Sequence, residues 1–403
     1  MFNELLKVRE KRANLVKKTA QSTDVVTIKS NIVGSEKNIP LALLTTKYFA
    51  KKINEFGVKG LKSFYSVDGL TVLGKTNDGN LLKKQAISLE ETHPLGRLID
   101  IDITLKNQSQ SLSRGSLRKC FLCENPAFVC GKNKTHKVED LINYFNNTSK
   151  SYFHNLIAKI IKESMLEELN IEDKFGLVTK TSNGSHSDMN YTTMVKAIEV
   201  IKEDLVDAFF VGLNAKTTKN LIKKLIPIGI SCEEKMRVVT NGANAYKGFI
   251  FAGGLLLAST GYALGNGLSY KSVYKVCADV YLDYITPTDT FGYKSYKYGF
   301  GGIRKEAQNG FKIVENSQKL LSKKPLWKVL TYILSQIDDS VLLKRATSFE
   351  RYDYFKKLIV NCNFKNKKAI TDECIKNNIS IGGSADILIC ALLIDKIKKT
   401  FIF

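Results

Sequence analysis

Hydrophobic and polar residues alternate over several short runs in the first third of the chain. Four of these runs are rich in β-branched and aromatic residues and predict strands: DVVTIKSNIV (24–33), LKSFYSV (61–67), LTVLGK (70–75) and RLIDIDITL (97–105). Two other runs repeat apolar residues every three to four positions and predict helices: LLTTKYFAKKINEFG (43–57) and KVEDLINYF (137–145). This mixture predicts an N-terminal α/β (α+β) fold.

The pattern changes after the polar stretch NNTSKS (146–151). Beyond it, apolar residues recur at helical spacing, beginning with the segment 153–169. A chain of 403 residues with 44% hydrophobic content is long enough for more than one core. We therefore predict two domains, an α/β domain over 1–148 and an all-α domain over 152–403, with the polar stretch between them.

The most apolar run, FIFAGGLLLASTGYALG from Phe249, is too short and too rich in glycine and hydroxyl groups for a membrane span, which needs roughly 20 apolar residues. It predicts a buried helix. The N-terminal segment MFNELLKVREKRANLVKK is amphipathic and lacks the continuous apolar core of a signal peptide. We expect a cytoplasmic protein that does not associate with a membrane.

The formal net charge of +22 favours a polyanionic partner in principle. The charge is spread along the whole chain, however, without a basic tail or a nucleic-acid-binding motif, so we expect no nucleic-acid partner. Only nine of the 61 basic residues are arginine. Where lysine is the usual cation, an arginine indicates a need for planar, bidentate contacts. The arginines that this argument selects are Arg97, Arg114, Arg118, Arg304 and Arg345.

Two aspartates interrupt the apolar run 97–105. On a strand, Asp100 and Asp102 point to the same face, about 7 Å apart. Two like charges at that distance need a cation, a proton or an arginine nearby. Gly96 and Arg97, just before the strand, suit a phosphate, since glycine admits close backbone approach and a guanidinium binds two phosphate oxygens. The alternative is a solvated strand face that pairs with lysines.

Loops between the predicted helices contain an unusual concentration of acids and glycines. A single carboxylate at a helix start commonly compensates the helix dipole, and Asp188 alone would be explained as a cap. Five such loops together predict a polar cleft that binds phosphate and metal in the all-α domain. Their candidate residues are Gly184, His186, Asp188, Glu233, Asn244, Lys247, Gly248, Arg304, Glu306, Asp338, Asp339, Arg345, Gly382, Gly383, Ser384 (also a predicted helix cap) and Asp386.

Three of the eight cysteines cluster in RKCFLCENPAFVCGKNKTHK. Cys120 and Cys123 have Cys-x-x-Cys spacing, and Cys130 and His136 follow at distances that can complete a tetrahedral Zn²⁺ site. The alternative is that these cysteines are small core residues without a metal.

With these residues in view, the chain resembles two enzymes of citrate lyase prosthetic-group biosynthesis. The N-terminal part resembles the holo-acyl-carrier-protein synthase, or apo-citrate lyase phosphoribosyl-dephospho-CoA transferase, in REKRA, in Glu90-Glu91, in HPLGRLIDIDI and in RKCFLCENPAFVC followed by Thr135-His136. The C-terminal part resembles triphosphoribosyl-dephospho-CoA synthase in GLVTKTSNGSHSDM, EEKMRVVTNGANAYKGFIF, GGIRKEAQNGF, IDDSVLLKR and ISIGGSADIL. This part departs from the family pattern at Phe175, Tyr246, Ser340, Val341 and Ile381, and in the absence of glycines after Arg345.

The resemblance implies a two-step synthesis. In the first step, a ribose hydroxyl of 3′-dephospho-CoA displaces adenine from ATP to give 2′-(5″-triphosphoribosyl)-3′-dephospho-CoA. In the second, the phosphoribosyl-dephospho-CoA group is transferred to a serine of the apo acyl carrier (gamma) subunit of citrate lyase, with release of pyrophosphate. The implied cofactor is Mg²⁺, and ATP is a substrate.

The implied roles divide between the two parts. In the N-terminal part, Asp100 and Asp102 would hold Mg²⁺ while Arg97, Arg114 and Arg118 steady phosphates. In the C-terminal part, the acids would supply metal ligands and a base, and the cations would hold the triphosphate. The acids are Asp188, Glu233, Glu306, Asp339 and Asp386, with His186 beside them; the cations are Lys247, Arg304 and Arg345.

Three alternatives remain open at this point. The same chemistry serves malonate decarboxylase, although the fused N-terminal part favours citrate lyase. A zinc-containing nucleic-acid-binding protein would use the charge and the cysteines but leave the acidic loops without a purpose. A non-catalytic partner would account for the departures from the family pattern.

Overall fold

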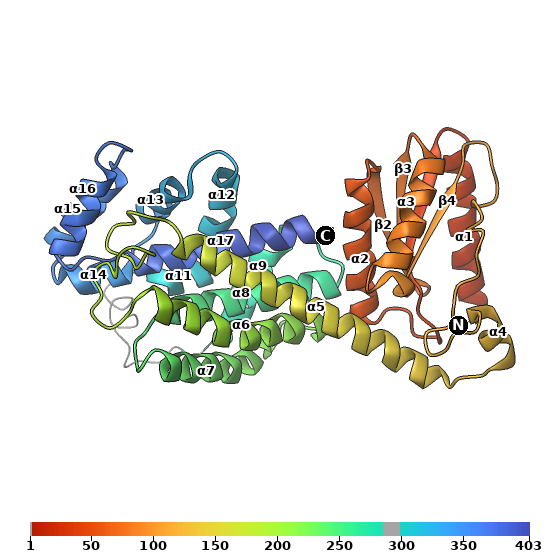
Figure 1. Ribbon diagram of the computed structural model, residues 1–403, viewed down its shortest axis with the longest axis horizontal. Helices are drawn as coiled ribbons and strands as arrows, with labels where there is room; N and C mark the ends of the chain where they lie inside the picture. Colours follow the sequence, from red (N-terminus) through yellow and green to blue (C-terminus); the bar gives the residue numbers. More distant parts are fainter. Residues whose placement is uncertain (1, 285–298) are drawn as a thin grey trace. The chain divides into compact units, whose positions relative to one another are not determined.

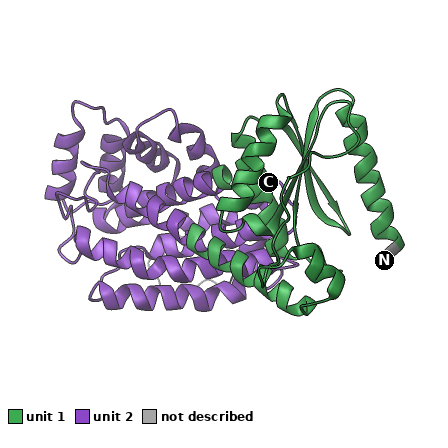
Figure 2. Cartoon of the chain, turned by 45° about the vertical axis from the view of Figure 1, so that its right-hand side comes forward, with its two compact units in different colours: residues 1–156, 398–403 green, residues 157–397 purple. Residues whose placement is uncertain are grey.

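The computed structural model describes residues 2–284 and 299–403. It divides into two compact units, one of residues 1–156 with 398–403 and one of residues 157–397 (Figures 1 and 2). The first contains the whole sheet and the second is helical. The predicted succession of a mixed region and a helical region is therefore confirmed.

The first unit has a βαββαβ order, the ferredoxin-like arrangement, preceded by one more helix. All four predicted strands are present and all neighbours pair antiparallel, in the order β2-β3-β1-β4. The N-terminal fold is thus α+β, without parallel strand pairs in its sheet. The elements are α1 (Phe2–Ala20), β1 (Asp24–Ser30), α2 (Pro40–Glu55), β2 (Lys59–Ser66), β3 (Gly69–Thr76), α3 (Gly79–Thr92), the 3₁₀ turn η1 (Gly96–Leu98) and β4 (Ile99–Thr104).

Helices α1 and α2 lie on opposite faces of this sheet (Figure 1). Ser30 of β1 points to α2, where its hydroxyl donates to the carbonyl oxygen of Ala42 at 2.7 Å. The neighbouring residue Lys29 points to the other face and contacts Asp68, which also pairs with Arg12 of α1. The alternation of side chains along a strand therefore separates a buried, hydrophobic face from a charged face beneath α1.

The polar stretch 146–151 is not a linker, contrary to the prediction. It lies inside α5 (Val138–Leu169), which follows α4 (Ala127–Asn133). The helix has a buried face across this region, because Phe145 and Phe153 are fully buried and Ser149 is buried between them, 3.5 Å from the hydroxyl of Thr45. The polar stretch therefore does not mark a break in the secondary structure.

Within the described residues, all regular secondary structure of the second unit is helical. They are most of α5, then α6 (Tyr191–Asn214), α7 (Leu221–Val239), α8 (Lys247–Gly265), α9 (Ser272–Tyr281), α11 (Gly302–Gln308), α12 (Lys312–Leu321), α13 (Leu326–Gln336), α14 (Ser340–Ala346), α15 (Phe349–Val360), α16 (Lys367–Lys376) and α17 (Gly382–Thr400).

Helix α8 is the central helix of this unit, as predicted for the apolar run at Phe249. It is long and apolar enough for a membrane span, but 78% of that window is buried inside the protein. Small residues let it approach α6 closely: a Cβ on Gly212 would lie 1.9 Å from the carbonyl oxygen of Ala258, and one on Gly261 2.1 Å from that of Phe209. The glycines are required because backbone packs directly against backbone.

A buried ion pair joins Lys174 to Glu168, with 2.8 Å between their side-chain atoms and exposures of 1% and 3%. We expect Lys174→Met to lower the free energy of unfolding by about 3–5 kcal/mol, because it leaves the buried carboxylate without its cation. Chemical denaturation measures this. The matched control Lys368→Met removes an exposed pair with Asp372 and should cost less than about 0.5 kcal/mol. Equal effects of the two substitutions would contradict the account.

Candidate active sites

The predicted aspartate pair lies on one face of β4, as the strand spacing required. In the antiparallel register, Asp100 is opposite Lys29 of β1. Asp102 is opposite Thr27. Asp100 is half-exposed and its Oδ1 lies 3.0 Å from Nη2 of Arg118. Burial raises the pKa of Asp102, and the charge of Asp100 raises it further, so a cation bound beside the pair would relieve a real repulsion.

Buried Glu90 brings two predicted arginines to the same strand. Its carboxylate is 3% exposed and lies 2.5 Å from Arg114 and 2.6 Å from Arg118. It also accepts the backbone N–H of Ile101 at 3.0 Å and so covers part of the open edge of β4. Burial raises the pKa of Glu90 although both arginines oppose this. Arg118 thus bridges Glu90 and Asp100.

Gly96 and Arg97 serve the geometry of the turn before β4. A Cβ on Gly96 would lie 2.3 Å from the carbonyl oxygen of Glu90, so no other residue fits without displacing the backbone. The guanidinium of Arg97 donates to the carbonyl oxygen of Cys120 at 2.9 Å. Arg97 therefore holds the following loop against the turn, and its predicted contact with phosphate stays a prediction.

A second charged group, which the sequence analysis missed, lies at the hairpin between β2 and β3. The side chain of Asp68 is fully buried and pairs with Arg9 at 3.1 Å, with Arg12 at 2.5 Å and with Lys29. Burial alone would raise the pKa of Asp68, but hydrogen bonds from these three cations outweigh it and lower the pKa to about 2. Both arginines belong to the REKRA segment, which was the available signal.

His93, the first residue of the HPLGR block, is held by hydrogen bonds on both ring nitrogens. Its Nδ1 accepts the N–H of Leu95 at 3.0 Å, and its Nε2 lies 3.2 Å from the hydroxyl of Tyr48 and 3.0 Å from that of Tyr152. Burial lowers the pKa of His93 to about 4. The ring is therefore neutral at physiological pH and orients the start of the turn.

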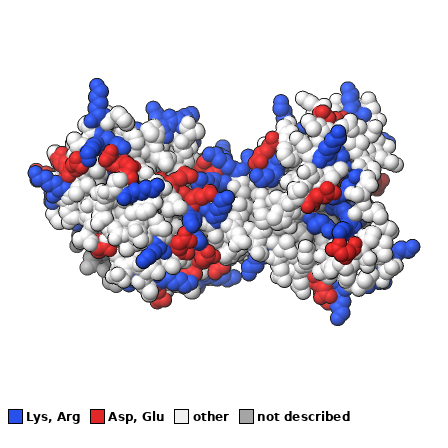
Figure 3. Space-filling view, in the orientation of Figure 1, with Lys and Arg blue, Asp and Glu red and all other residues white. Residues whose placement is uncertain are grey.

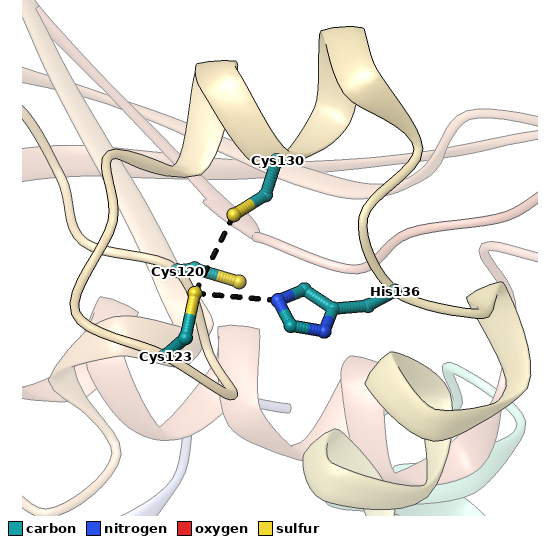
Figure 4. Close-up of side chains that lie close together, drawn as sticks. All are labelled: Cys120, Cys123, Cys130 and His136. Carbon is teal, nitrogen blue, oxygen red and sulfur yellow. Dashed lines mark hydrogen bonds between the residues drawn. The ribbon is translucent and has the colours of Figure 1, made fainter.

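The four predicted zinc ligands converge (Figure 4). One ligand atom from each of Cys120, Cys123, Cys130 and His136 lies within 4.8 Å of the others. The Sγ atoms of Cys123 and Cys130 are 3.5 Å apart, and Nε2 of His136 is 3.3 Å from Sγ of Cys123. Ligands 2.0–2.3 Å from a tetrahedral Zn²⁺ are separated by roughly these distances. The donor set and its geometry fit zinc.

In the second unit, Asp339 joins two helix starts. Its carboxylate accepts the N–H groups of Val341 and Leu342 at the start of α14 and those of Gly383 and Ser384 at the start of α17. It also accepts the Ser384 hydroxyl at 2.8 Å. Ser384 was predicted to cap the last helix; this is wrong, because Ser384 lies inside its first turn. Asp339, 45 residues earlier, supplies the acceptor.

Asp386 lies against the start of α8. A Cβ on Gly248 would lie 2.0 Å from its Oδ2, which explains the glycine. Burial raises the pKa of Asp386 well above the ordinary value, and the charges of Asp339 and Glu168 raise it further, although the N–H of Phe249 lowers it. The raised pKa favours the protonated form of Asp386, which can donate a proton.

The start of α8 also carries a cation and its acidic partner. Lys247 forms an ion pair with Glu233 of α7 at 2.7 Å. Its backbone N–H donates to the side-chain oxygen of Asn244 at 3.3 Å. The charges of Glu233 and Arg304 both act on the pKa of Tyr284, which burial raises. A direct contact therefore joins the predicted residues of α7 and α8, and the position of Arg304 of α11 beside them stays a prediction.

Glu306 of α11 accepts the backbone N–H of Ile313 in the first turn of α12. Burial raises the pKa of Glu306, the Ile313 N–H and the charge of Lys305 lower it, and the charge of Asp338 raises it. Asp338 itself pairs with Lys305 at 3.7 Å and accepts the N–H of Gly301 at 3.2 Å. Asp338 adjoins Asp339 in the chain, which links Glu306 to the helix starts.

The predicted histidine lies in a separate contact group. Nδ1 of His186 is 3.0 Å from the guanidinium of Arg345 and 3.8 Å from Asp188, and Nε2 is 3.3 Å from the hydroxyl of Ser380. Burial and the charge of Arg345 lower the pKa of His186 to about 4. Asp188 is not a helix cap: Asn190 caps α6.

A hollow of about 560 Å³ lies beside the start of α6, lined by residues 179–184 and 190–192. It includes the predicted Gly184, whose φ of +61° requires glycine. A Cβ there would also lie 2.3 Å from the carbonyl oxygen of Gly176. The hollow is polar and open, and its lining does not include the predicted carboxylates.

The two contact groups of the second unit approach each other through residues 380–384. Ser380 contacts His186, and Ser384 contacts Asp339. The segment between them includes Gly382 and Gly383, and a Cβ on the latter would lie 2.9 Å from Asp339. The contacts bring together Asp339, Asp386, Gly248 and Ser384; a single cleft that also includes His186 and Asp188 stays a prediction.

Comparison with known proteins gives two adjacent family matches. Residues 154–402 match the model of the CitG family, ATP:dephospho-CoA triphosphoribosyl transferase. Residues 1–152 match the CitX family, apo-citrate lyase phosphoribosyl-dephospho-CoA transferase.

Individual relatives match different shares of the chain. The chain is 29% identical to "Protein CitXG" of Leuconostoc mesenteroides subsp. cremoris over 79% of this chain and 78% of the relative. It is 27% identical to "Protein CitXG" of Haemophilus influenzae over 77% and 76%. It is 26% identical to the 2-(5″-triphosphoribosyl)-3′-dephosphocoenzyme-A synthase of Haemophilus ducreyi over 66% of this chain and 96% of that protein.

Proposed function

Because the chain belongs to the ATP:dephospho-CoA triphosphoribosyl transferase family and carries an apo-citrate lyase phosphoribosyl-dephospho-CoA transferase region before it, we propose that each region has its own active site. The chain is a bifunctional transferase. It makes 2′-(5″-triphosphoribosyl)-3′-dephospho-CoA from ATP and 3′-dephospho-CoA with release of adenine. It then transfers the phosphoribosyl-dephospho-CoA group to the apo acyl carrier protein of citrate lyase with release of pyrophosphate. We assign the two steps to the ranges 152–403 and 1–148.

The observation that carries this proposal is that each region has its own acid cluster beside its own cations. In the N-terminal region Asp100 and Asp102 lie beside Arg118. In the helical region Asp386 lies against Gly248, the residue after Lys247, and the Lys247 ammonium pairs with Glu233. Both reactions handle polyphosphates, which need such pairs of metal-binding acids and cations.

In the helical region, we assign proton transfer to Asp386. The attacking ribose hydroxyl forms a bond to C1′ of ATP as the bond to adenine breaks. Asp386, whose protonated form is favoured by burial, donates its proton to the departing adenine and regains one from the hydroxyl, so the protons balance. The remaining acids, Glu233, Glu306, Asp339 and Asp188, stabilise the positive charge that develops on the ribose or hold Mg²⁺.

The cations of the helical region suit the triphosphate. Lys247 pairs with Glu233 of α7, Arg304 belongs to the same short helix as Glu306, and Arg345 contacts His186, which also contacts Ser380. Asn244, Gly248, Gly382 and Gly383 let backbone approach the phosphates closely. Gly184 would do the same at the hollow beside α6.

In the N-terminal region, we assign Asp100 and Asp102 to Mg²⁺. Mg²⁺ held by these two residues would supply positive charge against the departing pyrophosphate. Arg118, already bonded to Asp100, then contacts the same phosphates, with Arg97 and Arg114 next to it. The serine oxygen of the carrier forms a bond to the phosphorus atom of the transferred group as the bond from that phosphorus to pyrophosphate breaks, and the serine proton leaves with the pyrophosphate.

The carrier and the cellular location follow from the same assignment. Lysines and arginines are scattered over the face in Figure 3 with acids among them, and the net charge of +22 attracts an acidic carrier protein. ATP and dephospho-CoA are cytoplasmic metabolites, so we place the protein in the cytoplasm. A nucleic-acid-binding role would leave both family matches without explanation.

The cluster of Cys120, Cys123, Cys130 and His136 completes the proposal as a structural Zn²⁺ site. All four positions are protein ligands, which is typical of structural zinc and leaves no open position for chemistry.

Incubation of the purified chain with ATP, 3′-dephospho-CoA and Mg²⁺ tests the proposed function. We expect one free adenine for each triphosphoribosyl-dephospho-CoA formed. Addition of the apo carrier should release pyrophosphate and increase the carrier mass by one prosthetic group. If no adenine appears, the chain is a non-catalytic partner, the alternative that Tyr246 and the other departures from the family pattern suggested.

Gly248 offers a sharp test of the site at the start of α8. We expect Gly248→Ala to lower the rate of adenine release about tenfold or more, because its Cβ displaces Asp386 and overpacking of this kind costs about 1–3 kcal/mol. The matched control is Gly254→Ala on the same helix, where the added Cβ meets only Leu205 at 3.6 Å. Equal adenine release by both variants would argue against a role for this helix start.

A further inference from the structure

The segment between β4 and α4 carries Arg114 and Arg118 but has little hydrophobic core of its own. Leu117 is 67% exposed and Leu122 is 40% exposed. Among the described residues, its strand-like pairing consists of two isolated bridges, Thr104 with Ser111 and Lys119 with Pro126. Burial of apolar surface is therefore too small to fix the arginines where the N-terminal site needs them.

The four-ligand cluster lies in this segment and is bonded directly to the site. Arg118 is two residues before Cys120, and its carbonyl oxygen accepts the N–H of Ala127 at 2.7 Å. The carbonyl oxygen of Cys120 accepts from the guanidinium of Arg97 at 2.9 Å. The cluster therefore adjoins Arg97, which precedes β4, and Arg118, which follows it.

A metal at this cluster closes the chain between Cys120 and His136 into one rigid loop. The ligands come from the segment, from α4 and from the turn before α5 (Figure 4). Metal binding of this kind supplies folding free energy that a small hydrophobic core does not. Groups hydrogen-bonded to the ligands are then held in place as well.

We infer that Zn²⁺ bound by Cys120, Cys123, Cys130 and His136 positions Arg97 and Arg118 at β4, so that transfer to the carrier depends on zinc while adenine release does not. This inference rests on the proposed function of the N-terminal region. The zinc is a positioning element: it touches neither the carrier serine nor the phosphates. Without it, Arg118 no longer neutralises Asp100, and the pyrophosphate loses a cation.

Metal analysis of the purified full-length chain comes first, and we expect one zinc per chain. Replacement by Co²⁺ should give the intense near-ultraviolet absorption of thiolate ligation. Cys123→Ser should lose the metal and lower the rate of carrier labelling about tenfold or more, with adenine release unchanged. Cys362→Ser, at a buried cysteine of the helical unit, is the matched control and should change neither quantity.

A conservative variant separates the loss of zinc from general damage to the fold. His136→Cys keeps four ligands and should retain zinc and carrier labelling, whereas His136→Ala should lose both. Treatment of the wild-type chain with a zinc-selective chelator, with Mg²⁺ kept in excess, should stop labelling, and added Zn²⁺ should restore it; this test needs no variant to fold.

The outcomes distinguish the inference from the proposed function. A chain that binds no zinc, or a zinc-free chain that labels the carrier at the wild-type rate, overturns the inference alone. A zinc-loaded wild-type chain that never labels the carrier overturns the proposed function of the N-terminal region.

Discussion

The double substitution Asp100→Asn, Asp102→Asn is expected to abolish labelling of the carrier protein and to leave adenine release at the wild-type rate. Asparagine keeps the shape of both side chains and removes both charges. The structure gives the reason for a large effect: the two carboxylates share one face of β4, and the pKa of Asp102 is raised by burial and by its neighbour. Arg118 pairs with Asp100, and the raised pKa of Asp102 favours a further cation beside the pair.

The expected loss of carrier labelling is about 10³-fold or more, because a metal on a departing phosphate contributes several kcal/mol to the transition state. Mass spectrometry of the carrier and chromatography of free adenine measure the two activities on the same sample. The control Glu55→Gln removes a half-exposed carboxylate that pairs with Lys52 on α2 and should change neither activity. Parallel loss of carrier labelling and adenine release would show that the two activities do not have separate active sites.

The second large effect is expected from Asp386→Asn, which should lower adenine release about 10²–10⁴-fold. The neutral amide has nearly the same shape as the protonated acid that burial favours, so the fold should persist. It cannot donate and regain a proton. Carrier labelling should continue normally when the triphosphoribosyl intermediate is supplied.

The pH profile adds a readout that a structural role would not change. The pKa of Asp386 is raised, so its active, protonated form is present at low pH and is lost as the pH rises through that pKa. Wild-type adenine release should therefore fall on the alkaline side, and Asp386→Asn should lack this decline. Asp372→Asn, an exposed acid on α16, is the control. Full adenine release by Asp386→Asn would remove this residue from the mechanism.

Features that depend on local spacing were predictable from the sequence. The strand period places Asp100 and Asp102 on one face whatever surrounds them. The spacing of Cys120, Cys123, Cys130 and His136 restricts these ligands to a small volume, and they do converge. The apolar run at Phe249 predicted the core helix α8 for the same reason.

Features that depend on distant partners were not predictable. Ser384 reads as a helix cap until Asp339, from another helix start, is seen to supply the acceptor. Asp68 gains its role only when the hairpin meets α1, 59 residues away. The polar stretch 146–151 reads as a linker, but Phe145 and Phe153 bury one face of a continuous helix there. Pattern alone does not contain these contacts.

The most direct test of two independent sites is an exchange of intermediate between the two variants. Triphosphoribosyl-dephospho-CoA made by the Asp100→Asn, Asp102→Asn chain is purified and given, with apo carrier and Mg²⁺, to the Asp386→Asn chain. We expect the Asp386→Asn chain to label the carrier at the wild-type rate without ATP. Failure to label, with the wild-type chain active on the same intermediate, would contradict separate active sites in the two regions.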